Sequence, residues 1–305
     1  MSRVVPYLDE SPLAADVLSH ARITFTDLDG TLLGLGGSVL IDATGAPALT
    51  TVNAIVDVNR AGLDVVVCTG RNRIQTGEVS RILGWDSFIA ELGCIVMYDR
   101  RKPAQYLLGE WPAGVLLADE TPHQAMTRYG ALRVLTETFP GKIEEHEPWH
   151  TDREVTHVLR GSIDRTIAQE ALDTLEVPIA IIDNGIIHPP RHTLVDVDEI
   201  HVYHLVPRGT SKERAIRVLL ERRGITPADA VAIGDSATDV EMMGATALGV
   251  LVCNALRDPK VLAATEGLDT IVATRGERGD GWAEFAHAWL AAMRLSSPTP
   301  RARRA

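Results

Sequence analysis

The stretch Ile23-Thr24-Phe25-Thr26-Asp27-Leu28-Asp29-Gly30-Thr31-Leu32-Leu33 decides the fold of this chain. Its first four residues form a short apolar and β-branched run, which is typical of a buried β-strand. The run stops at two aspartates, and side chains two positions apart share one side of an extended chain. Such a pair repels itself unless a cation lies between the carboxylates or one of them carries a proton. A metal site, an acid with a nucleophile, and a plain Asp-Gly turn all remain open for this stretch alone.

The composition is that of a globular protein with room for more than one domain. The chain has 305 residues, of which 45% are hydrophobic, enough for two domains or for one domain with a large insertion. The net charge of −11 argues against nucleic acid as the main partner. No apolar run approaches the roughly 20 residues of a membrane span, and residues 1–10 lack a signal pattern. Nothing in the sequence indicates an oligomeric state.

The cysteines indicate a reducing compartment. Cys68, Cys94 and Cys253 each lie in an apolar context, and their odd number and irregular spacing do not suggest disulfide pairs. We therefore expect reduced, buried thiols in a cytoplasmic protein.

Strands and helices alternate along the first part of the chain and again near its end. This order predicts a Rossmann-like α/β core with a parallel sheet and right-handed crossovers. Thr210 and Glu213 predict a capping box before one of the helices. The expected strands are 23–26, 63–67, 88–90, 94–98, 230–234, 249–253 and 270–273, and the expected helices are 47–60, 74–83, 211–223 and 281–295.

The middle of the chain differs in character and predicts an inserted α+β domain. We expect an N-terminal extension over 1–21, a core domain over 22–99 and 205–295, the insertion over 100–204, and a disordered basic tail over 296–305. Asn184-Gly185 predicts a hairpin turn within the insertion. The elements expected there are helices at 122–138 and 165–175 and strands at 155–159, 179–183, 186–188 and 200–206.

Polar side chains follow several of the core strands, at the point where each strand ends. In open α/β sheets, ligands bind beyond the carboxyl ends of the strands. Lys212 lies in the first turn of a helix, where the dipole disfavours a cation by roughly 0.3–1 kcal/mol unless an anion shares the site. Carboxylate oxygens suit Mg²⁺, while lysine and threonine suit phosphate. The strand-end residues are Asp27, Asp29, Thr69, Asp235 and Asp239.

The chain resembles the haloacid dehalogenase superfamily of phosphatases. Four motifs match in order: Asp27-Leu28-Asp29-Gly30-Thr31, Cys68-Thr69-Gly70-Arg71, Gly209-Thr210-Ser211-Lys212 and Gly234-Asp235-Ser236-Ala237-Thr238-Asp239. The insertion between the second and third motifs resembles the type-two cap, subclass B, of the branch that contains Cof-like proteins and sucrose phosphatases. The resemblance covers residues from about 22 to 290.

The resemblance implies a role for each motif residue. Asp27 would attack phosphorus and form an aspartyl-phosphate, and Asp29 would protonate the leaving alcohol and then activate water. Mg²⁺ would be held by Asp27, the Asp29 backbone carbonyl and Asp235, with Asp239 orienting the metal site. The phosphoryl group would be bound by Thr69, Lys212 and Asn254. Arg71 is a candidate for contact with substrate or with a core carboxylate.

Two positions depart from the pattern of this branch. Thr238 stands where the last motif usually carries Asn, so its hydrogen bond to phosphate would have a shorter reach. Leu92-Gly93 stands where Asn-Gly is usual, so a polar substrate contact is missing there.

Several other functions use similar residues. A dehalogenase lacks the second carboxylate, which Asp29 supplies here, and a P-type ATPase has a lysine after its aspartate and many membrane spans. A phosphomutase or phosphotransferase would use the same core, and only the resemblance favours hydrolysis. A signalling or binding module that accepts phosphate on aspartate is far shorter and lacks a cap.

The expected substrate is a small phosphorylated metabolite, because a large cap encloses small molecules rather than phosphoproteins. The family-level expectation is a sugar phosphate. Cap residues that are candidates to face it, with no role assigned to any one, are His157, Arg160, His188, Arg191, His192, His201 and His204.

Overall fold

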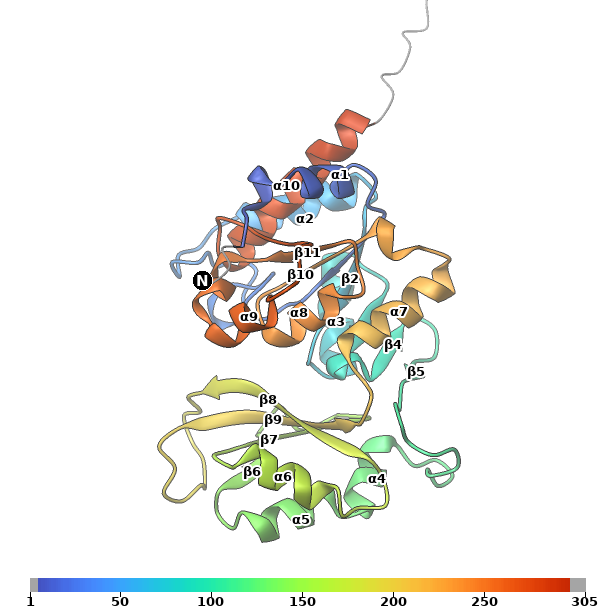
Figure 1. Cartoon of the computed structure of the whole chain (residues 1–305), viewed down its shortest axis with the longest axis vertical. Helices are drawn as coiled ribbons and strands as arrows, with labels where there is room; N and C mark the ends of the chain where they lie inside the picture. Colours follow the sequence, from blue (N-terminus) through green and yellow to red (C-terminus); the bar gives the residue numbers. More distant parts are fainter. Residues whose placement is uncertain (1–4, 297–305) are drawn as a thin grey trace, which may run out of the picture.

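An eight-stranded sheet forms the centre of the larger lobe in the computed structural model, which describes residues 5–296 (Figure 1). The strands from β12 to β3 run parallel to one another. At one edge, β4 pairs antiparallel with β3, and β5 pairs antiparallel with β4. The order across the sheet is β12 (Ile271–Ala273), β11 (Leu248–Leu251), β10 (Ala230–Gly234), β1 (Ile23–Thr26), β2 (Asp64–Cys68), β3 (Phe88–Ala90), β4 (Ile95–Met97) and β5 (Gln105–Tyr106).

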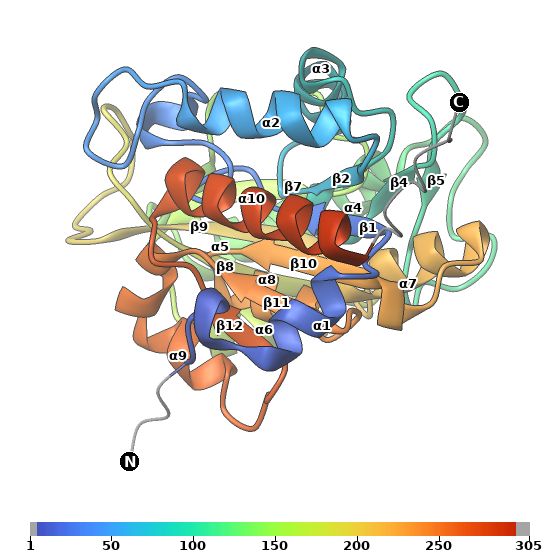
Figure 2. The same cartoon turned by 90° about the horizontal axis from the view of Figure 1, so that it is seen from above.

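Helices cover both faces of this sheet because its strands are apolar on both sides. In β2, Val65 and Val67 belong to one buried cluster, and Val66 and Cys68 belong to the other. Figure 2 shows α10 across one face with α1 and α2 beside it, and α7, α8 and α9 pack on the opposite face. The helices of this lobe are α1 (Pro12–Leu18), α2 (Thr50–Arg60), α3 (Arg73–Leu83), α7 (Lys212–Arg223), α8 (Ala237–Met243), α9 (Pro259–Ala264) and α10 (Arg278–Ser296).

The smaller lobe, the cap, is a four-stranded antiparallel sheet with helices on the side away from the core (Figure 1). Side chains of its strands alternate between the two faces. Leu159, Tyr203 and Leu205 pack under the helices, whereas Val158 and His204, which are paired across β7 and β9, face the core. The elements are β6 (Ile143–Glu145), β7 (His157–Gly161), β9 (Ile200–Pro207), β8 (Ile179–Ile187), α4 (Pro122–Arg128), α5 (Ala131–Thr138) and α6 (Arg165–Leu172).

The predicted fold class, a parallel α/β core with an inserted α+β domain, is confirmed. The chain leaves the large sheet after Tyr106 and leaves the small sheet at Pro207, a few residues beyond each predicted boundary. Within the predicted N-terminal extension, α1 packs Ala14, Val17 and Leu18 into the core. Residues 1–4 and 297–305, including nearly all of the predicted basic tail, lie outside the described residues.

Three local predictions are wrong. The helix predicted over 122–138 is two helices, because Gly130 between them takes a left-handed conformation with φ +87°. Asn184-Gly185 makes no hairpin but an irregularity inside β8, which pairs with β9 on both sides of it. The cap of α7 is Ser211 rather than Thr210, since the Ser211 hydroxyl accepts from the Arg214 N–H at 3.1 Å.

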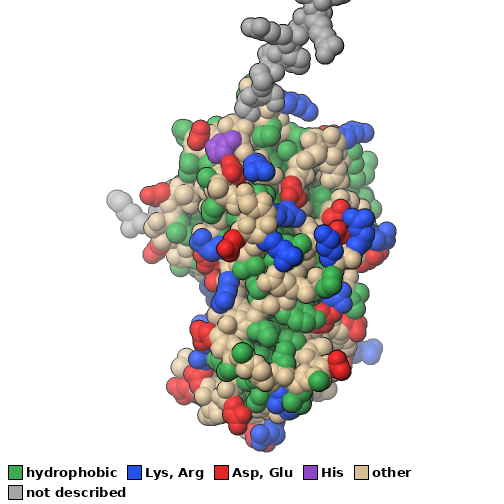
Figure 3. All heavy atoms as spheres, turned by 90° about the vertical axis from the view of Figure 1, so that its right-hand side faces the viewer, with side chains coloured by type: hydrophobic (Ala, Val, Ile, Leu, Met, Phe, Trp, Pro, Cys, Tyr) green, Lys and Arg blue, Asp and Glu red, His purple; other side chains and the backbone are tan. Residues whose placement is uncertain are grey.

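The two lobes also show in the space-filling view of Figure 3, where positive and negative side chains are interspersed on the visible face. None of the described helices is both long and apolar enough to cross a membrane.

Candidate active site

The floor of the site is a buried cluster at the carboxyl ends of β1 and β10 and the start of α7. Lys212 donates from Nζ to Asp27 Oδ1 at 2.9 Å and to Asp239 Oδ1 at 2.7 Å. All three side chains are buried, and Asp239 and Lys212 are 0% and 4% exposed. Lys212 is therefore stabilised in the first turn of α7 by the two carboxylates that accept its hydrogen bonds. Burial of any of these three charges without a partner would be unfavourable.

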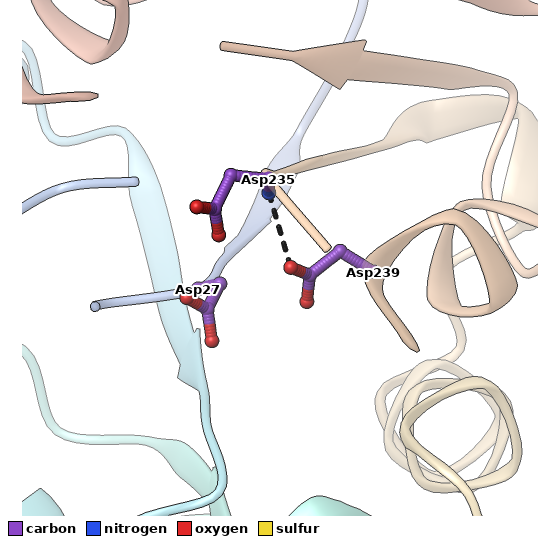
Figure 4. A group of neighbouring side chains, drawn as sticks. All are labelled: Asp27, Asp235 and Asp239. Carbon is purple, nitrogen blue, oxygen red and sulfur yellow. Dashed lines mark hydrogen bonds between the residues drawn. The ribbon is translucent and has the colours of Figure 1, made fainter. Parts of the chain in front are cut away.

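Asp235 directly follows β10, and Asp239 lies in the first turn of α8. The second oxygen of Asp239, Oδ2, accepts from the N–H groups of Asp235 and Ser236 at 3.0 and 2.9 Å and from the Ser236 hydroxyl at 2.7 Å. Figure 4 shows the side chains of Asp27, Asp235 and Asp239 beside one another, with the carboxylate of Asp239 turned toward the other two. Because both oxygens of Asp239 already accept hydrogen bonds, this residue is well placed to orient the cluster.

Asp235 is held from the other side by residues of two further strand ends. Its oxygens accept from the Thr31 hydroxyl at 3.2 Å and from the Asn254 amide at 3.0 Å. Asn254 also donates to the Gly30 carbonyl at 3.0 Å. Gly30 has φ +87°, and a Cβ there would lie 2.2 Å from Asp235 Oδ2, so only glycine fits. The structure thus places Asn254 against Asp235, where sequence reasoning assigned it to phosphate.

The charges of this cluster fit a divalent cation. One carboxylate oxygen from each of Asp27, Asp235 and Asp239 lies within 4.8 Å of the other two. Burial, together with the neighbouring carboxylates, raises the pKa of Asp27 well above its usual range and that of Asp235 to about 7. Burial lowers the pKa of Lys212, but Asp239 and Asp27 outweigh burial and raise it. Three carboxylates facing one ammonium leave an excess of negative charge in a buried site, and oxygen ligands of this kind suit Mg²⁺.

Asp29 and Arg71 form an ion pair at the rim of the site. The Arg71 guanidinium donates from Nε to Asp29 Oδ2 at 2.7 Å and from Nη2 to Oδ1 at 2.5 Å. The Asp29 side chain is 53% exposed and that of Arg71 is 27% exposed. The sequence left Arg71 between substrate and a core carboxylate, and the structure shows it on the carboxylate.

The cluster opens into a cavity of about 500 Å³ between the core and the cap. Asp27, Asp29, Thr69, Lys212 and Asp235 line its core side. Thr69 lies at the end of β2 and is 2% exposed. Thr238, which replaces the usual asparagine, also lines the cavity, and its hydroxyl is hydrogen-bonded to the Ser236 hydroxyl at 2.9 Å.

The cap residues suggested by the sequence lie in different places. Of them, His204 lines the cavity. His157 packs against His123 with ring centroids 3.7 Å apart, and His201 pairs with Asp183 and Glu199. A neighbouring hollow in the cap contains Arg160, His188 and Arg191.

Sequence reasoning missed two charged residues where the cap meets the core, Glu91 and Arg153. Glu91 is fully buried after β3, and its carboxylate accepts from the N–H groups of residues 154–156 and from the Thr156 hydroxyl at 2.7–3.1 Å. A charge directly after the apolar run of β3 was the available signal, because the other functional carboxylates also follow strands. Arg153 lies in a loop, and no local pattern distinguishes it.

The family model described as haloacid dehalogenase-like hydrolase matches residues 24–107 and 178–268, which include all four motifs. The chain belongs to this family. The family predicted from the motifs, and the prediction that the chain is an enzyme, are thereby confirmed.

Relatives of this haloacid dehalogenase-like hydrolase extend over most of its length. A phosphoglycolate phosphatase from Methanopyrus kandleri is 26% identical over 267 residues, covering 86% of this chain and 94% of the relative. The sucrose-phosphatase of Synechocystis sp. PCC6803, solved with sucrose and phosphate, has a TM-score of 0.56 at 15% identity and covers 88% of this chain and 98% of its own. A Thermoplasma acidophilum protein has a TM-score of 0.59 at 16% identity, with coverage of 88% and 98%. These structural likenesses extend through both lobes.

Proposed function

We propose that this haloacid dehalogenase-like hydrolase is a Mg²⁺-dependent phosphatase that hydrolyses a small phosphorylated metabolite through an aspartyl-phosphate. The observation that carries the proposal is the position of Asp27, a buried carboxylate held by Lys212 at the floor of the cavity, with Asp29 two residues away at its rim. The phosphatase names of the relatives support the same activity. The unpaired thiols of Cys68 and Cys94 support a cytoplasmic location.

The cation would be held by Asp27, Asp235 and the backbone at Asp29. When bound, Mg²⁺ would neutralise charge on the phosphoryl oxygens and on the clustered carboxylates. Asp239 keeps the cluster in place through its hydrogen bonds to Lys212, Asp235 and Ser236. Asn254 holds Asp235 from behind, and in this account it acts through Asp235 rather than on phosphate.

The reaction divides into two displacements at phosphorus. An Asp27 carboxylate oxygen forms a bond to phosphorus, while the bond to the leaving oxygen breaks and that oxygen takes a proton from Asp29. Asp29 then takes a proton from water as the water oxygen bonds to phosphorus, and the bond to Asp27 breaks to release phosphate. Lys212 and Thr69 hold the phosphoryl oxygens throughout.

Arg71 has to move for Asp29 to take part. Its guanidinium occupies both Asp29 oxygens, so at least one hydrogen bond must open before Asp29 can reach a leaving oxygen. We propose that the entering substrate draws Arg71 away.

The family resemblance favours a sugar phosphate as substrate, and the phosphoglycolate phosphatases among the relatives add a phosphorylated hydroxy acid as a second candidate. The test is phosphate release from a panel of phosphorylated sugars, hydroxy acids, polyols, nucleotides and phosphoserine with Mg²⁺. We expect selective turnover of a small ester. Phosphorylation of Asp27 by a small phosphodonor, with no release from any ester, would instead identify a phosphotransferase or a signalling acceptor.

A further inference from the structure

The cap side of the cavity carries a buried cation that forms no ion pair with any carboxylate in the described part of the chain. Arg153 is 9% exposed and lines the cavity. Its guanidinium donates to the carbonyl oxygens of Trp149 and Gly70 at 2.9 and 3.2 Å and to the Thr156 hydroxyl at 2.8 Å. All of these acceptors are neutral. A buried charge without a paired counter-charge is unfavourable, so this position suggests a ligand.

The Glu91 carboxylate does not act as a paired counter-charge for Arg153. Glu91 reaches Arg153 only through the Thr156 hydroxyl, and its own oxygens already accept from the backbone of residues 154–156. Burial lowers the pKa of Arg153 to about 10 even though Glu91 acts against that shift. A guanidinium has five N–H groups, and the hydrogen bonds of Arg153 leave one on Nη2 for a further acceptor.

Two neutral histidines lie on the same side of the cavity. His204 and His146 both line it, and the Nδ1 atom of each is buried without a hydrogen-bond partner. Burial, with Arg153 adding to it, lowers the pKa of both rings, for His146 to about 4. Of the described residues that line the cavity, every carboxylate belongs to the core. The cap side thus offers one cation with two neutral imidazoles beside it along the same cavity.

We propose that Arg153, with His146 and His204, forms a subsite for a carboxylate on the leaving group of the substrate. This inference rests on the proposed phosphatase function and narrows the substrate to a phosphorylated hydroxy acid, a class that includes phosphorylated sugar acids. The phosphoryl group lies on Asp27 and Lys212, and the carboxylate lies across the cavity on Arg153. A volume of about 500 Å³ accommodates a small molecule of this kind.

The test compares two esters of nearly the same size and shape, 2-phosphoglycolate and its amide, 2-phosphoglycolamide, which lacks the negative charge of the carboxylate. We expect the wild-type enzyme to have a kcat/KM about 30-fold higher for the acid, the size expected of a charge-assisted hydrogen bond. Arg153→Met should lower kcat/KM for the acid by about the same factor and leave that for the amide within about 3-fold. Equal turnover of acid and amide by the wild-type enzyme would overturn the subsite without needing any variant.

Arg73→Met is the matched control. Arg73 also joins the core to the cap, through Glu154 at 2.7 Å, but it does not line the cavity. We expect this variant to keep the preference for the acid. If Arg153→Met lowered turnover of acid and amide equally, Arg153 would be only a bridge between the lobes. If no ester at all were hydrolysed, the proposed function would fail and the subsite with it, whereas equal or better turnover of neutral esters would overturn the subsite alone.

Discussion

The two sides of the cavity differ in the kind of buried group they carry. Burial raises the pKa values of carboxyl groups on the core side and lowers the pKa values of basic groups on the cap side. In the core, burial raises the pKa of Asp27 well above its usual range, and that of Asp235 to about 7. In the cap, burial lowers the pKa of His146 to about 4 and that of Arg153 to about 10. The core therefore favours an added cation, and the cap favours an added anion.

The two sides of the cavity also differ in how their side chains are held, and this difference assigns the reaction to one side and substrate selection to the other. The carboxylates of the core lie at the ends of parallel strands and are fixed by Lys212 and by backbone N–H groups. The cap presents one face of an antiparallel sheet and a loop, where the same backbone can carry many different side chains. We infer that the core sets the reaction and that the cap sets the leaving group.

The largest expected effect is that of Asp27→Asn, which removes the nucleophile from the core side. A neutral amide does not attack phosphorus, so kcat should fall by at least ~10³-fold, with the circular dichroism spectrum unchanged. Asp64→Asn is the matched control, because Asp64 begins β2, at the opposite end of the strands from the site, and pairs with Arg223. Retained turnover in Asp27→Asn would disprove the assignment of the nucleophile.

Removal of the metal should come next in size. With EDTA we expect phosphatase activity to fall by ~10²-fold or more and to return with Mg²⁺, because the carboxylate cluster needs a cation. Mg²⁺ should also raise the unfolding temperature of the wild-type protein, since it binds the folded state, and should do so less in Asp235→Asn. An unfolding temperature that ignores Mg²⁺ would contradict the metal site independently of activity.

Lys212→Met tests how much the Lys212 ammonium stabilises the buried carboxylates of Asp27 and Asp239. The change leaves Asp27 and Asp239 buried without their shared cation, so the free energy of unfolding should fall by about 3–5 kcal/mol, measured by denaturant titration. Lys142→Met, in the cap, removes an ammonium that donates to the carbonyl groups of Val195 and Asp196, and we expect a much smaller loss. Equal losses would mean that the cluster contributes no special stability.

The smallest effect is expected from a change at Glu91, whose carboxylate joins the core to residues 154–156 of the cap. Glu91→Gln places an amide against three backbone N–H groups and a hydroxyl, which should lower the free energy of unfolding by about 2 kcal/mol. Thermal unfolding measures this loss. Glu78→Gln, on the surface beside Arg81, should leave the unfolding temperature unchanged. A variant of Glu91 as stable as the wild-type protein would show that the cap does not depend on this carboxylate.

The sequence predicted the core better than the cap because the core is built from local signals. Each buried strand is an apolar run that ends at a polar residue, and parallel topology alone brings those ends together. Asp27, Thr69, Lys212 and Asp235 therefore line one cavity, as their positions in the motifs predicted. Their catalytic and metal-binding roles stay predictions.

Local signals failed where distant contacts decide the structure. Asn184-Gly185 is a strong turn signal, yet pairing of β8 with β9 on both sides of it keeps the strand continuous. Arg153 and Glu91 reach their positions beside the cavity and between the lobes only because the cap folds back onto the ends of β2 and β3. Loop arginines carry no periodic pattern, so nothing in the sequence separates Arg153 from the exposed arginines.

The central claim is that Asp27 becomes phosphorylated during hydrolysis. The most direct measurement is rapid acid quenching of Asp29→Ala with Mg²⁺ and an aryl phosphate, whose leaving group needs no proton from Asp29, followed by mass spectrometry of peptides. Phosphorylation of Asp27 then still proceeds, whereas loss of the group that activates water should slow dephosphorylation. We predict one added phosphoryl group on Asp27 and none in the double variant that also carries Asp27→Asn. A phosphoryl group on another residue, or on the double variant, would contradict the account.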